Sequence, residues 1–364
     1  MRLLLAIALA GCQPDDASPG DPLGPWPTEP HTLATFCPSL PYPELVTTCR
    51  VQAAADLGRA GESDAAWAVC ASVPAGTWYE ECHFRAGEEL GRAGATLPAL
   101  RHCREAGWFG RNCLTHAGWN LPADPELGPD TPPATLATAA EELDAGVQQA
   151  LAGAADGLPG EGRDIVLARY GYNVFVGRGR ATPEAARLDG AVGAALRTGF
   201  AIEAARLLPE PSVEAILDVW RGETPPPEGP PLPPGSRMGR YAQRVLAPGE
   251  RGAPFAPTFG GGARLIGVSP EEDVTIAALE ALFWREDTAA EAFLPWVDDP
   301  RERVRWTAAR LVRLAPPETL DLPAVLTRIA ETHPDENVRW QARNGLENRT
   351  WEPPPRPGAH PGAP

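Results

Sequence analysis

Between Cys37 and Leu121 the chain repeats itself with a period near 33 residues. The string Leu-Gly-Arg-Ala-Gly occurs at 57–61 and at 90–94, and before it apolar residues or cysteines stand at offsets 0, 3, 7 and 11. Those offsets mark one face of an α-helix, and a period of this length is typical of a helical hairpin in a stacked array. A third, shorter copy ends at Leu121. The repeat therefore predicts an all-α fold of α-solenoid-like helical hairpins.

The N-terminus has the order of a secretory signal, with a charged start and an apolar run before Leu9-Ala-Gly-Cys12. This ending resembles the signal of bacterial lipoproteins. The resemblance implies removal of residues 1–11 and acylation of Cys12, which would attach the protein to membrane lipid. In that family an Asp after the cysteine favours the inner membrane, so Gln13 favours the outer membrane, facing the periplasm or the exterior. No later stretch is long and apolar enough to span a bilayer.

The charge and composition exclude several classes of function. The formal net charge is −16, and all 32 basic residues are Arg. Without Lys there is no P-loop lysine and no Schiff-base lysine. The acidic balance argues against binding nucleic acid, which needs clustered cations. We find no HExxH or GxSxG motif, so we predict no catalytic residue and no cofactor.

Six cysteines remain once Cys12 is assigned to lipid, an even number in an exported chain. An oxidising compartment favours disulfides between them. Pairing the second helix of each hairpin with the first helix of the next uses all six. That pairing joins Cys37 to Cys49, Cys70 to Cys82 and Cys103 to Cys113. Pairing within hairpins would instead join Cys49 to Cys70 and Cys82 to Cys103, and leave two cysteines unpaired, so we favour the first.

Histidines beside these cysteines suggest an alternative interpretation, in which the cysteines bind a metal ion. His83 adjoins Cys82, His102 adjoins Cys103, and His116 follows shortly after Cys113. Cys and His together can build a zinc site. However, the sequence has no CxxC motif, and free thiols would oxidise outside the cytoplasm. We therefore predict disulfides and no metal ligand, and keep a Cys/His metal-binding protein as an alternative.

Both repeat regions resemble known helical-repeat families. The Leu-Gly-Arg-Ala-Gly strings, with an Ala-rich helix after them, resemble degenerate tetratricopeptide-type hairpins. In the last third, Val304-Arg-Trp306 and Val338-Arg-Trp340 are near-copies. With Asp335 three residues before Val338, they resemble HEAT repeats, which implies a polar ladder between repeats. Arg305 and Arg339 would bond acids and carbonyls there, and Trp306 and Trp340 would be largely packed. The same four residues are our candidates for a partner surface.

The middle of the chain gives weaker patterns. Residues 134–152 read as a helix, and 172–176 fit either a helix or a short strand. Thr182-Pro-Glu184 has the composition of a helix start, from which we expect a helix to Leu208. The predicted organisation follows. It consists of a signal peptide (1–11), a disordered tether (12–35), Cys-bridged hairpins (36–121), a helical middle region (134–222), a Pro-rich linker (223–237), a HEAT-like region (238–349) and a disordered Pro-rich tail (350–364).

These features predict a lipid-anchored, exported helical-repeat protein that binds a protein partner or serves as a scaffold in the cell envelope. Repeat arrays present extended surfaces that suit such a role. The alternatives are an exported enzyme or enzyme accessory, and the Cys/His metal-binding protein.

Overall fold

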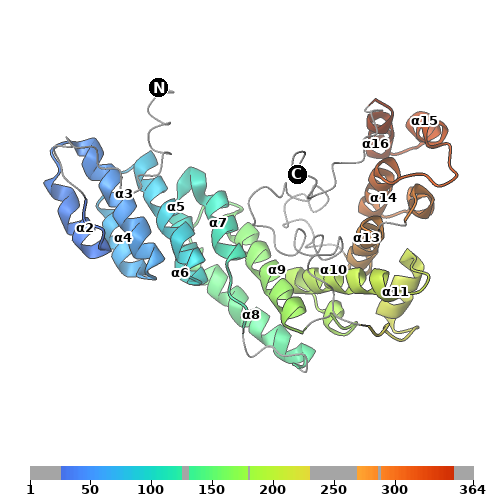
Figure 1. Ribbon diagram of the computed structural model, residues 1–364, viewed down its shortest axis with the longest axis horizontal. Coiled ribbons are helices and arrows are strands. Elements are labelled where there is room, and N and C mark those ends of the chain that lie inside the picture. Colours follow the sequence, from blue (N-terminus) through green and yellow to red (C-terminus); the bar gives the residue numbers. More distant parts are fainter. Residues whose placement is uncertain (1–25, 125–130, 179–180, 230–268, 286–287, 348–364) are drawn as a thin grey trace, which may run out of the picture. The chain divides into compact units, whose positions relative to one another are not determined.

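The computed structural model describes residues 26–124, 131–178, 181–229, 269–285 and 288–347. In these residues every regular element is a helix, which confirms the all-α prediction (Figure 1). The chain forms two compact units, Met1–Asn120 with Ala150–Leu158, and Leu121–Gln149 with Pro159–Pro364. Of the helices described, none is long and apolar enough to cross a membrane. Cys12 and the signal motif lie outside the described residues.

The first unit is a stack of helical hairpins, in which α3 packs against α5 and α5 against α7 (Figure 1). Its helices are α2 (Pro30–Phe36), α3 (Pro43–Arg59), α4 (Ser63–Ala71), α5 (Thr77–Arg92), α6 (Thr96–Glu105) and α7 (Gly110–Trp119), with short 3-10 helices η1 (Cys37–Ser39) and η2 (Gly107–Phe109). The solenoid-like arrangement expected from the repeat is therefore present in this unit.

The repeated Leu-Gly-Arg-Ala-Gly string has a structural reason for each glycine. Gly61 and Gly94 have φ of 80° and 81°, a left-handed conformation that ends α3 and α5 and suits glycine. Gly58 and Gly91 lie inside the helices at their closest approach to the next one. A Cβ at Gly58 would stand 2.7 Å from the Ala86 carbonyl oxygen, so only glycine fits without a shift.

The three disulfides join Cys37 to Cys49, Cys70 to Cys82 and Cys103 to Cys113. This is the pairing that the repeat favoured, with Cα separations of 5.2–5.5 Å. All six cysteines are fully buried between the helices. Each bridge closes the loop that leads from one hairpin into the next, so the disulfides hold neighbouring repeats together.

The first described helix begins earlier than the sequence suggested. The segment predicted as a tether extends to residue 35, but α2 already starts at Pro30. The Glu29 carboxylate caps this helix by accepting the backbone N–H groups of His31 and Thr32, and Leu33 is buried. Leu33 packs in one cluster with the bridged Cys37 and Cys49, so the tether prediction is wrong for residues 30–35.

The second unit has one continuous apolar core. Its helices are α8 (Pro133–Ala150), α9 (Leu158–Arg178), η3 (Ala185–Arg187), α10 (Gly190–Leu207), α11 (Val213–Arg221), α13 (Pro270–Phe283), η6 (Ala290–Trp296), α14 (Glu302–Leu314), α15 (Leu322–Thr332) and α16 (Glu336–Glu347). Residues 172–176 are helical, within α9. The single helix expected from Thr182 to Leu208 is broken instead, because the chain turns between η3 and α10, and Gly190 at the start of α10 has a φ of 67°.

The middle region and the C-terminal helices share this core. Helix α10 packs against α13, and the buried Arg197 of α10 pairs with Asp273 of α13 at 2.9 Å. The Pro-rich segment 223–237 therefore does not divide two separate cores, as the sequence had suggested. Residues 230–237 of that segment, and the predicted tail 350–364, lie outside the described residues.

Candidate functional site

Two of the residues proposed for a partner surface in the C-terminal repeats are engaged inside the unit. Arg305 donates through Nε to Oδ2 of Asp335 at 2.6 Å, and Trp306 donates its indole N–H to the same oxygen at 3.0 Å. The other carboxylate oxygen of Asp335 accepts the backbone N–H groups at the start of α16. These contacts join α14 to the loop before α16, so Arg305 and Trp306 stabilise the packing of neighbouring repeats.

The equivalent residues of α16 are Arg339 and Trp340, and they differ in how far they are engaged by neighbouring groups. Arg339 donates to the backbone oxygens of His333 and Pro334 at 2.6 and 3.0 Å, and it pairs with Glu336. Trp340 is 52% exposed. Of the four candidates, Trp340 alone presents a largely exposed aromatic side chain.

A second set of exposed aromatic residues lies in the first unit. Tyr42, Trp78 and Trp108 are 61%, 48% and 90% exposed. Tyr42 precedes α3, Trp78 lies in the first turn of α5, and Trp108 lies in η2 before α7. Each stands between the two cysteines of one disulfide. We refer to these three residues as the aromatic edge.

The packing of the helices places the loop of Trp108 beside the start of α5, the helix that carries Trp78. Helices α5 and α7 run parallel, since a Cβ at Gly87 would meet Cys113 Sγ and one at Gly91 would meet Ala117, each at 2.8 Å. The backbone N–H of Trp108 donates to Glu80 Oε2 at 3.2 Å. The loop that carries Trp108 thus lies against the first turns of α5, where Trp78 is located. The sequence signal was available, because each cysteine-bounded loop contains one of these aromatic residues.

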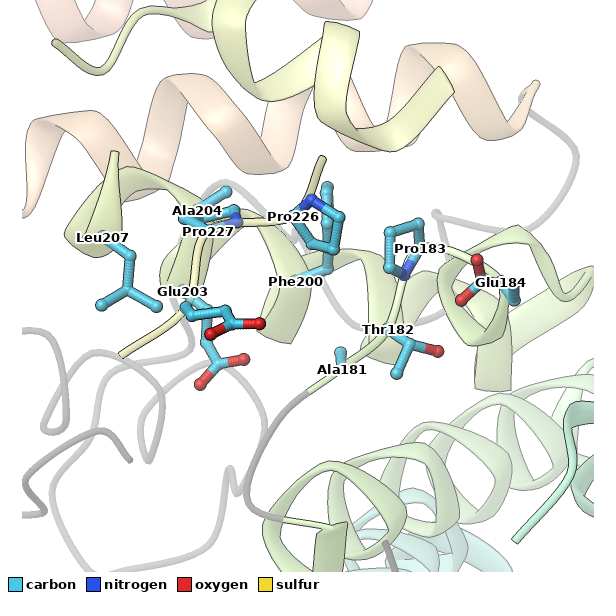
Figure 2. A pocket seen from close by; sticks show the side chains of 11 residues that line it. Ala181, Thr182, Pro183, Glu184, Phe200, Glu203, Ala204, Leu207, Pro226 and Pro227 are labelled. Carbon is cyan, nitrogen blue, oxygen red and sulfur yellow. The ribbon is translucent and has the colours of Figure 1, made fainter. Parts of the chain in front are cut away.

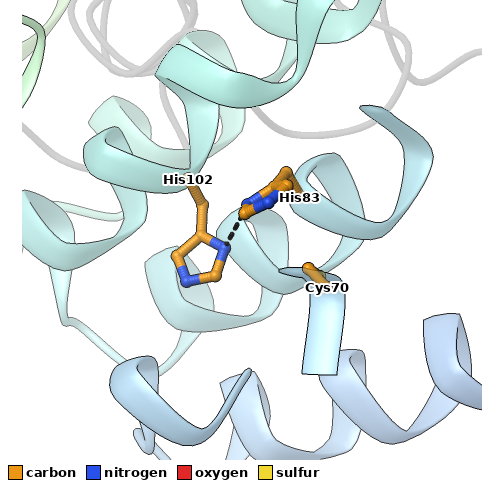
Figure 3. A group of neighbouring side chains, drawn as sticks. All are labelled: Cys70, His83 and His102. Atoms are coloured by element: carbon orange, nitrogen blue, oxygen red, sulfur yellow. Dashed lines mark hydrogen bonds between the residues drawn. The ribbon is translucent and has the colours of Figure 1, made fainter. Parts of the chain in front are cut away.

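The interior of the first unit holds a pair of histidines (Figure 3). His83 of α5 and His102 of α6 are fully buried, and their Nδ1 atoms lie 3.1 Å apart. Trp67 packs edge-on against both rings, at centroid distances of 4.7 and 5.1 Å. Cys70 of α4 contributes a sulfur atom to the same cluster.

The hydrogen bonds of this pair fix the position of each proton. His102 Nε2 faces the carbonyl oxygen of Ser63 at 3.4 Å, and a carbonyl only accepts, so the proton of His102 is on Nε2. His102 Nδ1 then accepts from the Nδ1–H of His83. His83 Nε2 is left as a buried lone pair with no hydrogen-bond partner among the described residues.

Burial keeps both imidazoles uncharged at neutral pH. It lowers the pKa of His83 from 6.5 to about 4, with a further contribution from the positive charge of Arg104. Burial also lowers the pKa of His102 to about 4, and the neighbouring His83 adds to the effect. Sequence reasoning noted both histidines beside cysteines, but their contact required the packing of α5 on α6.

The second unit has a pocket of about 180 Å³ (Figure 2). Phe200 and Leu207 of α10 line it together with Pro226 and Pro227. Its lining also includes three Glu side chains and the hydroxyl of Thr182, which accepts a backbone N–H from Ala185. This lining contains no imidazole, thiol or amine that could pair with the hydroxyl as a base.

The described residues therefore offer two features for function, the aromatic edge on the surface and the Cys/His cluster in the interior of the same unit. Both are built by the repeat, since the first depends on the disulfide loops and the second on the packing of consecutive helices. Comparisons of the chain with protein-family models, with curated proteins and with solved structures found no match.

Proposed function

We propose that this is an exported, lipid-anchored helical-repeat protein of the cell envelope that binds a protein partner through its aromatic edge. The observation that carries the proposal is that each of three consecutive disulfide loops holds one exposed aromatic residue, Tyr42, Trp78 or Trp108. Large exposed aromatic side chains are costly to leave in water, and Trp and Tyr are enriched among the residues that dominate protein interfaces.

The disulfides make this edge suitable for binding. Each aromatic residue lies in a loop closed by a bridge across 10 or 12 residues. Ordering a flexible loop on binding costs free energy, and a loop already constrained avoids part of that cost. A partner therefore meets side chains on backbone segments that are already held in place.

The charge of the chain supports a protein as the partner. A formal net charge of −16 disfavours nucleic acid and strongly anionic surfaces. The acidic residues Glu44, Glu80 and Glu81 lie in α3 and α5 close to the edge in sequence. Aromatic residues rimmed by charges are typical of a protein interface, with an apolar centre and a polar rim.

The proposed location rests on two features. Three disulfides indicate an oxidising compartment and thus export. The Leu-Ala-Gly-Cys motif supports acylation of Cys12, and Gln13 after it supports the outer membrane. The resemblance of the C-terminal repeats to HEAT repeats agrees with a scaffold or binding role, without a catalytic one.

The test is site-specific photo-crosslinking in intact cells. A photoreactive phenylalanine analogue replaces Trp78 or Trp108, and as a matched control it replaces Trp340, which is about as exposed as Trp78. We expect the first two variants to capture the same protein and the control not to capture it. Crosslinks to lipid alone, or the same set of proteins from all three positions, would contradict the proposal.

A further inference from the structure

Three helices bring two nitrogen ligands and one sulfur to one buried place in the first unit (Figure 3). Cys70, His83 and His102 are each fully buried, and one donor atom from each lies within 4.8 Å of the others. Ligand atoms around a tetrahedral zinc ion stand roughly 3.3–3.8 Å apart, given bonds of about 2.0–2.3 Å. The cluster would therefore need to contract by at most about 1.5 Å to hold such an ion.

We propose that reduction of the Cys70–Cys82 disulfide converts this cluster into a tetrahedral metal site for Zn²⁺ or a similar cation. The four ligands are the thiolates of Cys70 and Cys82 and the imidazoles of His83 and His102. The inference is independent of the proposed function, because it concerns the interior of the unit and not its aromatic edge.

One nitrogen ligand is free for a metal, and the other becomes free when the hydrogen bond from His83 to His102 Nδ1 opens. His83 Nε2 is a buried acceptor without a partner in the described part of the chain. Leaving such a group unpaired costs free energy, so a cation that accepts a histidine lone pair relieves a cost that the folded unit carries. The second ring nitrogen of His102 bonds the Ser63 carbonyl, the kind of contact that orients metal-bound histidines.

The sulfur ligands become available through a balanced exchange. A dithiol supplies two electrons and two protons to the Cys70–Cys82 bond and leaves as a disulfide, which gives two thiols in the protein. Binding of Zn²⁺ then releases one proton from each thiol, because thiolates are the ligand form. Cys82 is not itself one of the three clustered residues, but it is bonded to Cys70, so after reduction a rotation of its side chain brings its sulfur to the same ion.

The other two disulfides provide an internal comparison. In the described residues, Cys70 with His83 and His102 is the one group of three or more potential ligand side chains that come together. The Cys37–Cys49 bridge has the same sequence separation of 12 residues as Cys70–Cys82. Removing it therefore changes the number of cysteines and the loop closure equally, but leaves the histidine cluster in place.

The test compares two samples of the full chain. One is oxidised, and the other is reduced with a dithiol that is then removed under nitrogen. Both samples are titrated with Zn²⁺ or Co²⁺. We expect one tightly bound ion per reduced chain, with the visible absorption of tetrahedral Co²⁺, and none in the oxidised chain. The control Cys37→Ser with Cys49→Ser should bind like the parent. His83→Gln and His102→Gln should each weaken binding by at least about tenfold, and Cys70→Ser with Cys82→Ser should abolish it.

The proposal fails if the reduced parent binds no more tightly than the Cys70→Ser, Cys82→Ser variant, or if the oxidised chain binds the metal equally well. Circular dichroism monitors helix content in each sample. If reduction unfolds the hairpins and added Zn²⁺ does not restore the helical signal, the proposal fails as well, because the packed helices then do not form the site.

Discussion

Arg197 and Asp273 form an ion pair whose side chains are only 2% and 3% exposed, with Nη2 and Oδ2 2.9 Å apart. Arg197 also donates to the carbonyl oxygens of Ala186 and Leu188. Burial raises the pKa of Asp273 and lowers that of Arg197, and their mutual attraction opposes both shifts. The pair links α10 to α13, so the core of the second unit depends on two charges that water does not screen.

Arg197→Met should therefore destabilise the protein strongly. It removes the closer cation from the buried Asp273 carboxylate and leaves only Arg303, at 3.8 Å, and breaking a buried pair in this way typically costs about 3–5 kcal/mol. Urea unfolding at neutral pH measures the change, and adding Asp273→Leu to the variant should recover part of it. The control is Arg163→Met, which breaks a more exposed pair with Asp144 and should cost less than about 1 kcal/mol. Equal losses from the two single variants would contradict the buried role of Arg197.

Acid should destabilise the first unit through its two buried histidines. Their pKa values are about 4 in the folded chain against 6.5 in the unfolded chain, so the unfolded chain binds protons first as the pH falls. The stabilisation is complete above pH 6.5 and is lost as the pH falls towards 4, by roughly 2–3 kcal/mol per histidine. Urea unfolding between pH 7 and 4 should show this slope, and His83→Gln with His102→Gln should flatten it. An unchanged slope in that variant would rule out these histidines as its source.

The helical glycines of the repeated string should resist enlargement. Gly58→Ala and Gly91→Ala place a Cβ within 2.7 and 2.8 Å of the backbone of the neighbouring helix, and overpacking of this kind typically costs about 1–3 kcal/mol. Gly160→Ala is the control, because its Cβ meets nothing within 4 Å and alanine favours a helix. Thermal unfolding should show lower midpoints for the first two variants and no loss for the third. A destabilised Gly160→Ala would mean that helix propensity does not govern that site.

The parts of this fold that repeat could be predicted from the sequence. The parts held together by contacts that occur only once could not. The offsets around Cys49 and Cys82 placed one face of each helix, and the spacing of cysteines between hairpins favoured the pairing that the structure contains. A repeat tells which helices are neighbours because each contact recurs. Gly58 and Gly91, for example, approach the following helix at equivalent points.

The contact of Arg197 with Asp273 has no such signal. The two residues are 76 positions apart, in segments that share no repeat, and the Pro-rich stretch between them suggested a boundary. The sequence shows that His83 and His102 each adjoin a cysteine. It does not show that the two imidazoles contact each other, because that contact depends on how α5 packs on α6. The sequence places an aromatic residue in each disulfide loop, but which of these side chains stay exposed depends on how the helices pack.

The membrane anchor should depend on one cysteine. Cys12→Ala removes the proposed site of acylation, and we expect the variant to be released from washed membranes or to remain unprocessed, because two or more acyl chains are what make anchoring stable. Fractionation of cells with immunoblotting measures the distribution, and Gln13→Ala, which keeps the cysteine, is the control for the substitution itself. If the Cys12→Ala protein stays wholly with washed membranes, another part of the chain binds them.

Reduction of the disulfides should lower the stability of the first unit and leave that of the second unit nearly unchanged. All three disulfides lie in the first unit, and each closes a loop of about a dozen residues, worth roughly 2–3 kcal/mol. The second unit has no disulfide among its described residues, and its apolar core is continuous without them. Because stability in stacked repeats is carried by nearest neighbours, a reductant should loosen the hairpins and leave the second unit nearly unchanged. Hydrogen exchange with and without reductant should show protection falling at Leu57 and persisting at Leu311. A similar fall at both residues would show that the two units unfold as one cooperative body.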